Sequence, residues 1–153
     1  MPRRGAATQE EGPISRLSAR QTLHCVLAGL VWAGFAYLLG SRSFGSAIRG
    51  GLLAAPLIGL AVGWLTQIGF ENAAGGRRGL VALVSLYLGA MLFGLSIGVT
   101  RLLVDGGGQR AALEVLLEPL FAVLWGITFT GFVLFLWPLS YFTHVLLEWL
   151  DTR

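Results

Sequence analysis

The sequence contains no lysine, a single cysteine and few charged residues of either sign. Its 11 basic side chains are all arginine, and charged residues make up 12% of the 153 residues, which is about half the share in an ordinary soluble domain. Hydrophobic residues reach 55%. A domain of this length and composition, folded in water, would lack enough polar side chains to cover its surface. The composition therefore predicts a membrane protein whose outer face contacts lipid.

What is missing also excludes several classes of site. The single cysteine, Cys25, excludes an intrachain disulfide and a cysteine-rich metal centre. The arginines are dispersed along the chain, so no dense basic stripe indicates binding to nucleic acid. The sequence has no HExxH, no zinc-ligand spacing and no Ser-His-Asp set, and Gly106–Gly108 lacks the Lys-Ser/Thr end of a phosphate-binding loop. We therefore expect no catalytic residues, no metal site and no enzymatic activity.

Long charge-free stretches divide the chain. Three stretches of about 21 residues contain no Asp, Glu, Lys or Arg, and they lie between Arg20 and Arg42, between Arg49 and Glu71, and between Arg78 and Arg101. A fourth such stretch, of about 29 residues, lies between Glu118 and Glu148. A helix of about 20 residues crosses the ~30 Å hydrocarbon layer, and these runs are apolar on every side, unlike the strands of a membrane barrel. The stretches predict four transmembrane helices, near residues 22–39, 51–70, 80–100 and 119–137.

The fourth stretch is longer than one straight crossing needs. Pro119 is expected at the favoured first-turn position of the fourth span, and Pro138 predicts a kink or break. Residues 139–150 then form either an interfacial helix or a continuation of the span into water. Residues 109–117 predict a short interfacial helix, with a plain loop as the alternative.

These elements together predict the fold class. It is an all-α, four-transmembrane-helix bundle with a short interfacial helix before the fourth span and a kinked C-terminal extension. We expect a mobile N-terminal tail over residues 1–21 and a single transmembrane domain over residues 22–150.

The arginine distribution predicts the orientation. With the N-terminus inside, seven arginines lie on inner segments and four in outer loops, which favours cytoplasmic termini at both ends. Exclusive use of arginine, with abundant Ala, Gly and Leu, indicates a GC-rich bacterial genome. The expected location is therefore the bacterial inner membrane, with the lipid bilayer and either other membrane subunits or a second copy as partners, and with no nucleic acid.

Small residues recur every fourth position in the spans. In the second span they form a GxxxG pair, which lets two helices approach closely. This pattern predicts a compact bundle, although one small-residue stripe facing another subunit is the alternative. The candidate packing residues are Gly29, Ala33, Gly59, Gly63, Gly94, Gly98 and Gly126.

Polar side chains inside the spans are few. No charged residue lies in the middle of a predicted span, which argues against proton relays, ion-coupled transport and voltage sensing. Gln67, Thr128 and Thr130 are candidates for a polar pathway or for a bridge between helices. His24 and His144 are either ligands of a haem or a metal or interfacial polar residues with backbone or water partners. Aromatic residues near the span ends predict interfacial anchors, namely Trp32, Tyr37, Trp64, Phe70, Trp137, Tyr141 and Trp149.

Three functional hypotheses follow from these features. The first is a structural or accessory subunit of a larger membrane complex, or a self-associating scaffold, which small-residue stripes, short loops and missing embedded charge favour. The second is a small oligomeric transporter or channel that uses Gln67, Thr128 and Thr130. The third is a haem- or pigment-binding electron-transfer subunit that uses His24 and His144; on the first two hypotheses no cofactor is expected.

Overall fold

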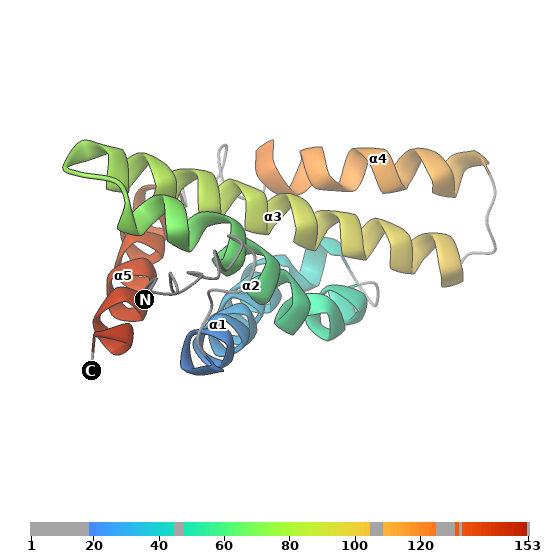
Figure 1. Cartoon of the computed structure of the whole chain (residues 1–153). Helices are drawn as coiled ribbons and strands as arrows, with labels where there is room; N and C mark the ends of the chain where they lie inside the picture. Colours follow the sequence, from blue (N-terminus) through green and yellow to red (C-terminus); the bar gives the residue numbers. More distant parts are fainter. Residues whose placement is uncertain (1–18, 45–47, 105–108, 125–130, 132, 153) are drawn as a thin grey trace, which may run out of the picture.

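A computed structural model describes residues 19–44, 48–104, 109–124, 131 and 133–152 of the chain. These residues form five helices and contain no strand (Figure 1), with helix bounds α1 Ala19–Phe44, α2 Ile48–Glu71, α3 Gly76–Val104, α4 Gln109–Val123 and α5 Val133–Asp151. Four stretches are long and apolar enough to cross a membrane, and they lie at Ala19–Leu38, Ile48–Glu71, Gly76–Val104 and Val133–Leu150. The chain is thus a helical, multi-pass membrane protein, as its composition predicts.

Helices α1 and α2 meet through glycine. A Cβ atom built on Gly59 would lie 2.5 Å from the Cα atom and 2.7 Å from the backbone nitrogen of Gly29, and one built on Gly63 would collide with the side chain of Cys25. In each case the absence of a side chain lets the facing helix approach within van der Waals contact. Gly29, Gly59 and Gly63 therefore lie at an internal helix contact, where Ala33 is also buried.

Helices α2 and α3 form an antiparallel pair joined by a short turn. Gly75 has a φ of 56°, a left-handed conformation that glycine adopts without steric cost and that commonly follows the end of a helix. The amide Nδ2 of Asn72 donates to the carbonyl of Ile68 at 2.9 Å, and the same carbonyl accepts from the backbone nitrogen of Asn72 at 3.1 Å, so the side chain reinforces the last turn of α2. The turn therefore fixes how α3 leaves α2.

Helix α4 packs along the second half of α3 (Figure 1). A Cβ atom built on Gly94 would lie 2.6 Å from the carbonyl oxygen of Glu118 and 2.8 Å from the Cα atom of Pro119. Pro119 is therefore inside a helix that begins at Gln109, not at the first turn of a span that begins with it. Packing against Gly94 explains how the helix persists past the proline, because tertiary contacts override a local preference.

The course of α4 also bears on the short interfacial helix expected over residues 109–117. Those residues form the first part of α4, which runs alongside α3. A helix that lay in the membrane plane would cross α3 at a steep angle. The arrangement therefore gives no support to the interfacial placement.

Helix α5 starts later than the fourth span drawn from the sequence. Gly131 has a φ of 72°, and because this conformation is not helical, α5 cannot be a straight continuation of α4. The helix runs from Val133 through Pro138 to Asp151, so Pro138 lies in its second turn instead of dividing a longer helix. Only one interior hydrogen bond is lost there. The span boundaries 119–137 thus do not coincide with any one helix.

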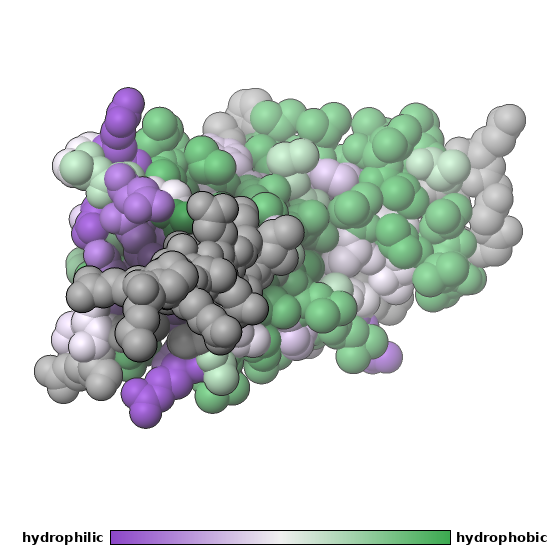
Figure 2. Space-filling view, in the orientation of Figure 1, coloured by the Kyte–Doolittle hydropathy of each residue, from purple (hydrophilic) through white to green (hydrophobic). Residues whose placement is uncertain are grey.

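The ends of α5 show that it crosses α3. Trp137 and Glu148 are about 16 Å apart along the helix axis, yet Trp137 contacts Gly79 and Glu148 contacts Arg78, which are adjacent in α3. Figure 1 shows α5 lying across the beginning of α3 at a steep angle. In Figure 2 hydrophobic residues cover most of the visible face, and hydrophilic residues gather at the left end, where α5 and the α2–α3 turn lie.

Candidate functional site

The largest group of interacting polar and aromatic side chains lies where α5 meets the end of α2. Gln67 and His144 are 1% and 3% exposed, and Phe70 between them is fully buried. Nδ1 of His144 lies 2.7 Å from Oε1 of Gln67, and Nε2 of Gln67 donates to Glu71 at 3.0 Å. A polar chain thus runs from a buried imidazole on α5 through an amide to an exposed carboxylate.

Glu71 determines the direction of these hydrogen bonds. An ionised carboxylate only accepts, so it takes the amide NH₂ of Gln67 and leaves the amide oxygen facing His144. Nδ1 of His144 must therefore carry the proton that it donates to Gln67. Because an amide does not exchange protons as an imidazole or carboxyl does, Gln67 cannot pass a proton stepwise between its two neighbours. These hydrogen bonds link α5 to the end of α2.

Aromatic contacts surround this chain. The rings of Phe70 and His144 are stacked, with centroids 4.9 Å apart and an interplanar angle of 17°, while Tyr141 meets Phe70 edge-on at 5.4 Å. The guanidinium carbon of Arg78 lies 5.2 Å from the centre of the Phe70 ring, within reach of a cation–π interaction. Phe70 is thus the centre of the α2–α3–α5 junction, whereas the sequence predicted a membrane anchor at this position.

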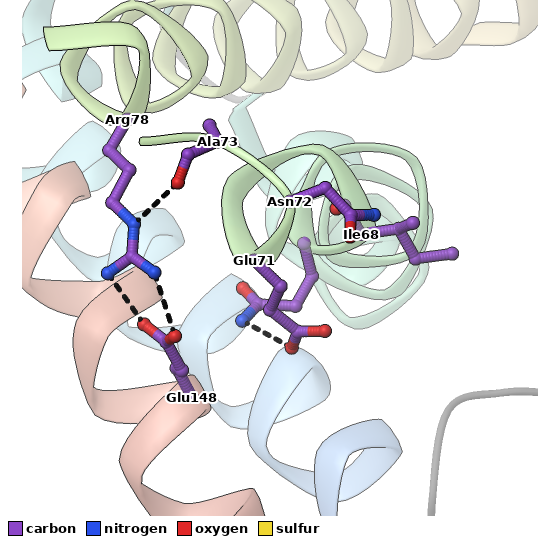
Figure 3. Close-up of polar contacts among 7 residues, drawn as sticks. Ile68, Glu71, Asn72, Ala73, Arg78 and Glu148 are labelled. Atoms are coloured by element: carbon purple, nitrogen blue, oxygen red, sulfur yellow. Dashed lines mark hydrogen bonds and ion pairs between the residues drawn. The ribbon is translucent and has the colours of Figure 1, made fainter. Parts of the chain in front are cut away.

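An ion pair closes the outer side of the junction. Arg78 donates from both terminal nitrogens to Glu148, at 2.9 and 3.0 Å, and from Nε to the carbonyl of Ala73 at 3.0 Å. Figure 3 shows the guanidinium held between the α2–α3 turn and α5. The two side chains are 28% and 31% exposed, so the bidentate geometry is favourable but solvent limits its contribution to about 1 kcal/mol.

Two further hydrogen bonds attach α5 to the backbone of α3. Nε1 of Trp137 donates to the carbonyl of Gly79 at 2.7 Å, and the hydroxyl of Ser140 donates to the carbonyl of Ala82 at 2.8 Å. Since helix carbonyls already accept one bond within their own helix, these bonds use their second lone pair. Helix α5 is therefore attached to α3 along its first half and to both α2 and α3 along its second half.

A second polar junction joins α3 to α4. Arg101 forms an ion pair with Glu118, whose side chain is 8% exposed. Arg101 follows Gly94 by two turns on the same face of α3, so Glu118 places its backbone against Gly94 and its carboxylate against Arg101. A buried carboxylate requires such a partner, since an unpaired charge there would cost several kcal/mol.

The two histidines proposed as cofactor ligands have different surroundings in the structure. His144 bonds to Gln67 and stacks on Phe70, while His24 on α1 lines a groove between α1 and α5. That groove has a volume of about 220 Å³, below the ~300–1,000 Å³ of typical ligand pockets. Within the described part of the chain, no three metal-ligating side chains come together.

The structure places the other candidate residues in different positions. Gln67, a candidate for a polar pathway or a helix bridge, contacts His144 on α5. Thr128, Thr130 and Gly126 lie outside the described residues, as does most of the N-terminal tail. Gly98 is buried in α3, and Gly94 lies at the contact with α4.

Sequence reasoning missed both ion pairs. Arg78 and Glu148 were assigned to the same membrane side, as were Arg101 and Glu118. A search for oppositely charged residues at the same membrane surface would therefore have suggested both ion pairs. No family model, curated protein or solved structure matches this chain.

Proposed function

We propose that this chain is a non-catalytic structural or accessory subunit of a larger membrane assembly, or a scaffold that assembles with itself. This proposal rests on the observation that the buried polar side chains at the α2–α5 and α3–α4 junctions bond to side chains of the facing helix. Gln67 joins α2 to α5, and Glu118 joins α4 to α3. Their hydrogen-bonding capacity serves to hold helices together, as expected for a chain whose task is to present a fixed helical surface.

Transport is the less favoured function, because Gln67 is the described member of the polar pathway that transport would require. Its amide oxygen and nitrogen both have partners within the chain, and the side chain is 1% exposed. A substrate or ion could reach this amide only by breaking the α2–α5 bridge. The geometry therefore supports a bridge better than a pathway.

The outer surface is where partners would bind. In the most apolar window of each candidate span, only 17–28% of the residues are buried, so most side chains face outward, toward lipid or another subunit. Leu53 and Leu57, one turn apart on α2, are 84% and 71% exposed, and Phe135 on α5 is 74% exposed. The proposal places the chain in the bacterial inner membrane. An even number of crossings puts both termini on one side, and the arginine distribution predicts that this side is cytoplasmic.

Gentle extraction tests the proposal. The full chain is taken from its native membrane in lipid–polymer discs, without detergent, and the mass and subunit composition of the particle are measured. We expect a particle larger than one chain, containing either a stoichiometric partner or additional copies. A particle of identical copies whose reconstituted form conducts ions or solutes, with flux abolished by Gln67→Leu, would support transport instead.

Tryptophan substitution then identifies the assembly face. Leu53→Trp and Phe135→Trp enlarge outward side chains and leave the internal contacts of the bundle unchanged. A position that faces lipid tolerates tryptophan, whereas a position within an interface does not. We expect at least one outward stripe to lose the larger particle while the thermal stability of the single chain is unchanged. If neither these nor similar substitutions on α1 and α3 reduce the particle, a subunit role is contradicted.

A further inference from the structure

A narrow groove runs between α1 and α5. Its lining residues recur every three or four positions on both helices, so it follows the seam where the two helices lie side by side. It has a volume of about 220 Å³, and it is lined by His24, Leu27, Ala28, Val31, Trp32, Thr143, Leu146, Leu147 and Leu150. The hydroxyl of Thr143 donates to the carbonyl of Leu139 in its own helix. Among the lining side chains, His24 carries a buried polar atom without a hydrogen-bond partner.

The imidazole of His24 has an unmet hydrogen bond. Its Nδ1 atom is buried and has no partner, an arrangement that costs free energy in an apolar environment. The ring lines the groove. Rotation about the Cβ–Cγ bond is soft and nearly two-fold, so the ring can present Nδ1 to a group in the groove with little change in its outline.

The arginine Arg20 lies one helical turn before His24 on α1. Arg20 is exposed and precedes His24 by four residues, so the two side chains lie one above the other on the same face of α1, about 6 Å apart along the axis. Arg20 is the last charged residue before the charge-free stretch of α1. It therefore marks the level of the lipid headgroups, and His24 lies about 6 Å deeper, just below a headgroup layer that is ~5–7 Å thick on each side.

Arg20, His24 and the apolar groove follow one another along the membrane normal. A phospholipid has the matching order, with a phosphate at the surface, ester carbonyls a few ångströms below it and then an acyl chain. We propose that the α1–α5 groove binds one acyl chain of an anionic phospholipid, with an ester carbonyl accepting a hydrogen bond from His24 and the phosphate beside Arg20. At about 30 Å³ for a group the size of a water molecule, the groove holds roughly seven methylene groups. Leu27 and Val31 on one side and Leu146 and Leu150 on the other contact them.

The size of the groove argues against bulkier occupants. A helix is about 10 Å across with its side chains, so another transmembrane helix would cover the seam without filling it. An acyl chain is thin, apolar and present at every point of the surrounding lipid. The helix ends agree with this placement, since Figure 1 shows the beginning of α1 and the end of α5 at the same lower end of the view.

Native mass spectrometry of the full chain in mild detergent tests the proposal. The dissociation constant is measured for a diester phosphatidylglycerol, for the diether analogue that lacks both ester carbonyls, and for a diester phosphatidylcholine. The wild-type chain is expected to bind the diester phosphatidylglycerol about fivefold more tightly than the diether, the effect of one hydrogen bond. It should also bind phosphatidylglycerol more tightly than phosphatidylcholine.

Variants then assign each preference to a residue. His24→Phe keeps the ring and removes both nitrogens, so the preference for diester over diether should vanish. Leu23→Phe introduces the same side chain at an exposed position outside the groove and should keep that preference. Arg20→Gln should reduce the preference for phosphatidylglycerol over phosphatidylcholine and leave the diester preference intact.

The comparison of the three lipids on the wild-type chain requires no variant, so a folding defect in His24→Phe does not remove the test. Equal affinity of the wild-type chain for diester and diether lipids overturns the hydrogen bond to the carbonyl. Unchanged lipid selectivity in Arg20→Gln overturns the phosphate contact. Tighter binding of a lipid-soluble quinone than of any phospholipid overturns the assigned occupant.

Discussion

The closest backbone contact between α1 and α2 predicts a large effect of adding a single methyl group at Gly59. In Gly59→Ala the new Cβ atom would lie 2.5 Å from the Cα atom of Gly29, whereas ordinary contact begins at 3.4 Å. The atoms facing it belong to the backbone of Gly29 and Cys25, so no side-chain rotation relieves the overlap. The two helices must therefore separate by about 1 Å.

That separation has an estimable free-energy cost. The α1–α2 contact around Gly59 is taken to be as large as the contact around one buried leucine, which comprises about 50 heavy-atom pairs. A gap of up to 1 Å removes about a third of the attraction between these pairs. At ~0.15 kcal/mol for each pair, the loss is about 2–3 kcal/mol, in the usual range for overpacking. Packing is the main force between helices in lipid, so little else offsets the loss. We expect Gly59→Ala to lower the free energy of unfolding by about 2 kcal/mol.

Gly34→Ala is the matched control, since a Cβ atom there meets nothing within 4 Å. Both variants are measured by reversible unfolding in mixed micelles, followed by tryptophan fluorescence. The control should be neutral or slightly stabilising, because alanine favours helix more than glycine does. The double variant Gly29→Ala with Gly59→Ala should cost less than the two single variants together, because one separation of the helices accommodates both methyl groups. Equal stability of Gly59→Ala and Gly34→Ala would refute the reasoning.

Three further changes test the attachment of α5. Replacing Gln67 by Leu leaves the imidazole of α5 without its acceptor, so we expect a loss of about 1–3 kcal/mol in the same unfolding assay, and no loss would contradict a structural bridge. Arg78→Glu should speed amide hydrogen exchange in α5, and Glu148→Arg in the same chain should restore protection if the ion pair is direct; each single change should cost no more than about 1 kcal/mol because the pair is partly exposed. Trp137→Phe removes only the bond to the carbonyl of Gly79 and should cost about 1 kcal/mol, so a much larger loss would show that ring packing, not this bond, holds the start of α5.

The first three helices were predictable from the sequence because charge spacing reports them directly. In lipid a charged side chain is costly at depth, so the residues Arg20–Arg42, Arg49–Glu71 and Arg78–Arg101 show where α1, α2 and α3 can lie. The same physics explains the glycine contacts, since close helix approach requires small residues. Spacing alone could not say which helix each glycine would meet.

The fourth stretch could not be divided correctly, since apolar composition does not show where a helix stops. Pro119 and Pro138 are the residues that most often mark a helix boundary, yet both lie inside helices. The departure from helical geometry falls at Gly131 instead. Glycine occurs often within membrane helices, so nothing in the sequence distinguished this one. The same limit applied to the site: the sequence made Gln67 a candidate for a polar pathway or a helix bridge, but its partner His144 depends on how α5 lies.

The direction of α5 is the feature of the fold that a depth measurement can decide. Trp137 and Glu148 contact neighbouring residues of α3, so α5 crosses α3 and the two helices cannot both follow the membrane normal. Spin labels on cysteines at Leu134, Phe142 and Trp149, all exposed and on one side of α5, cover about 22 Å of helix. In a Cys25→Ala background, accessibility to oxygen and to a water-soluble nickel complex gives the depth of each label. We expect a steady change in depth of more than about 10 Å across the three labels, a sizeable part of the ~30 Å hydrocarbon layer, because α5 is a candidate span and lies beside α1 along the α1–α5 groove. Three depths that agree within about 5 Å would instead show α5 lying near the headgroups, and the acyl-chain site proposed between α1 and α5 would then be contradicted.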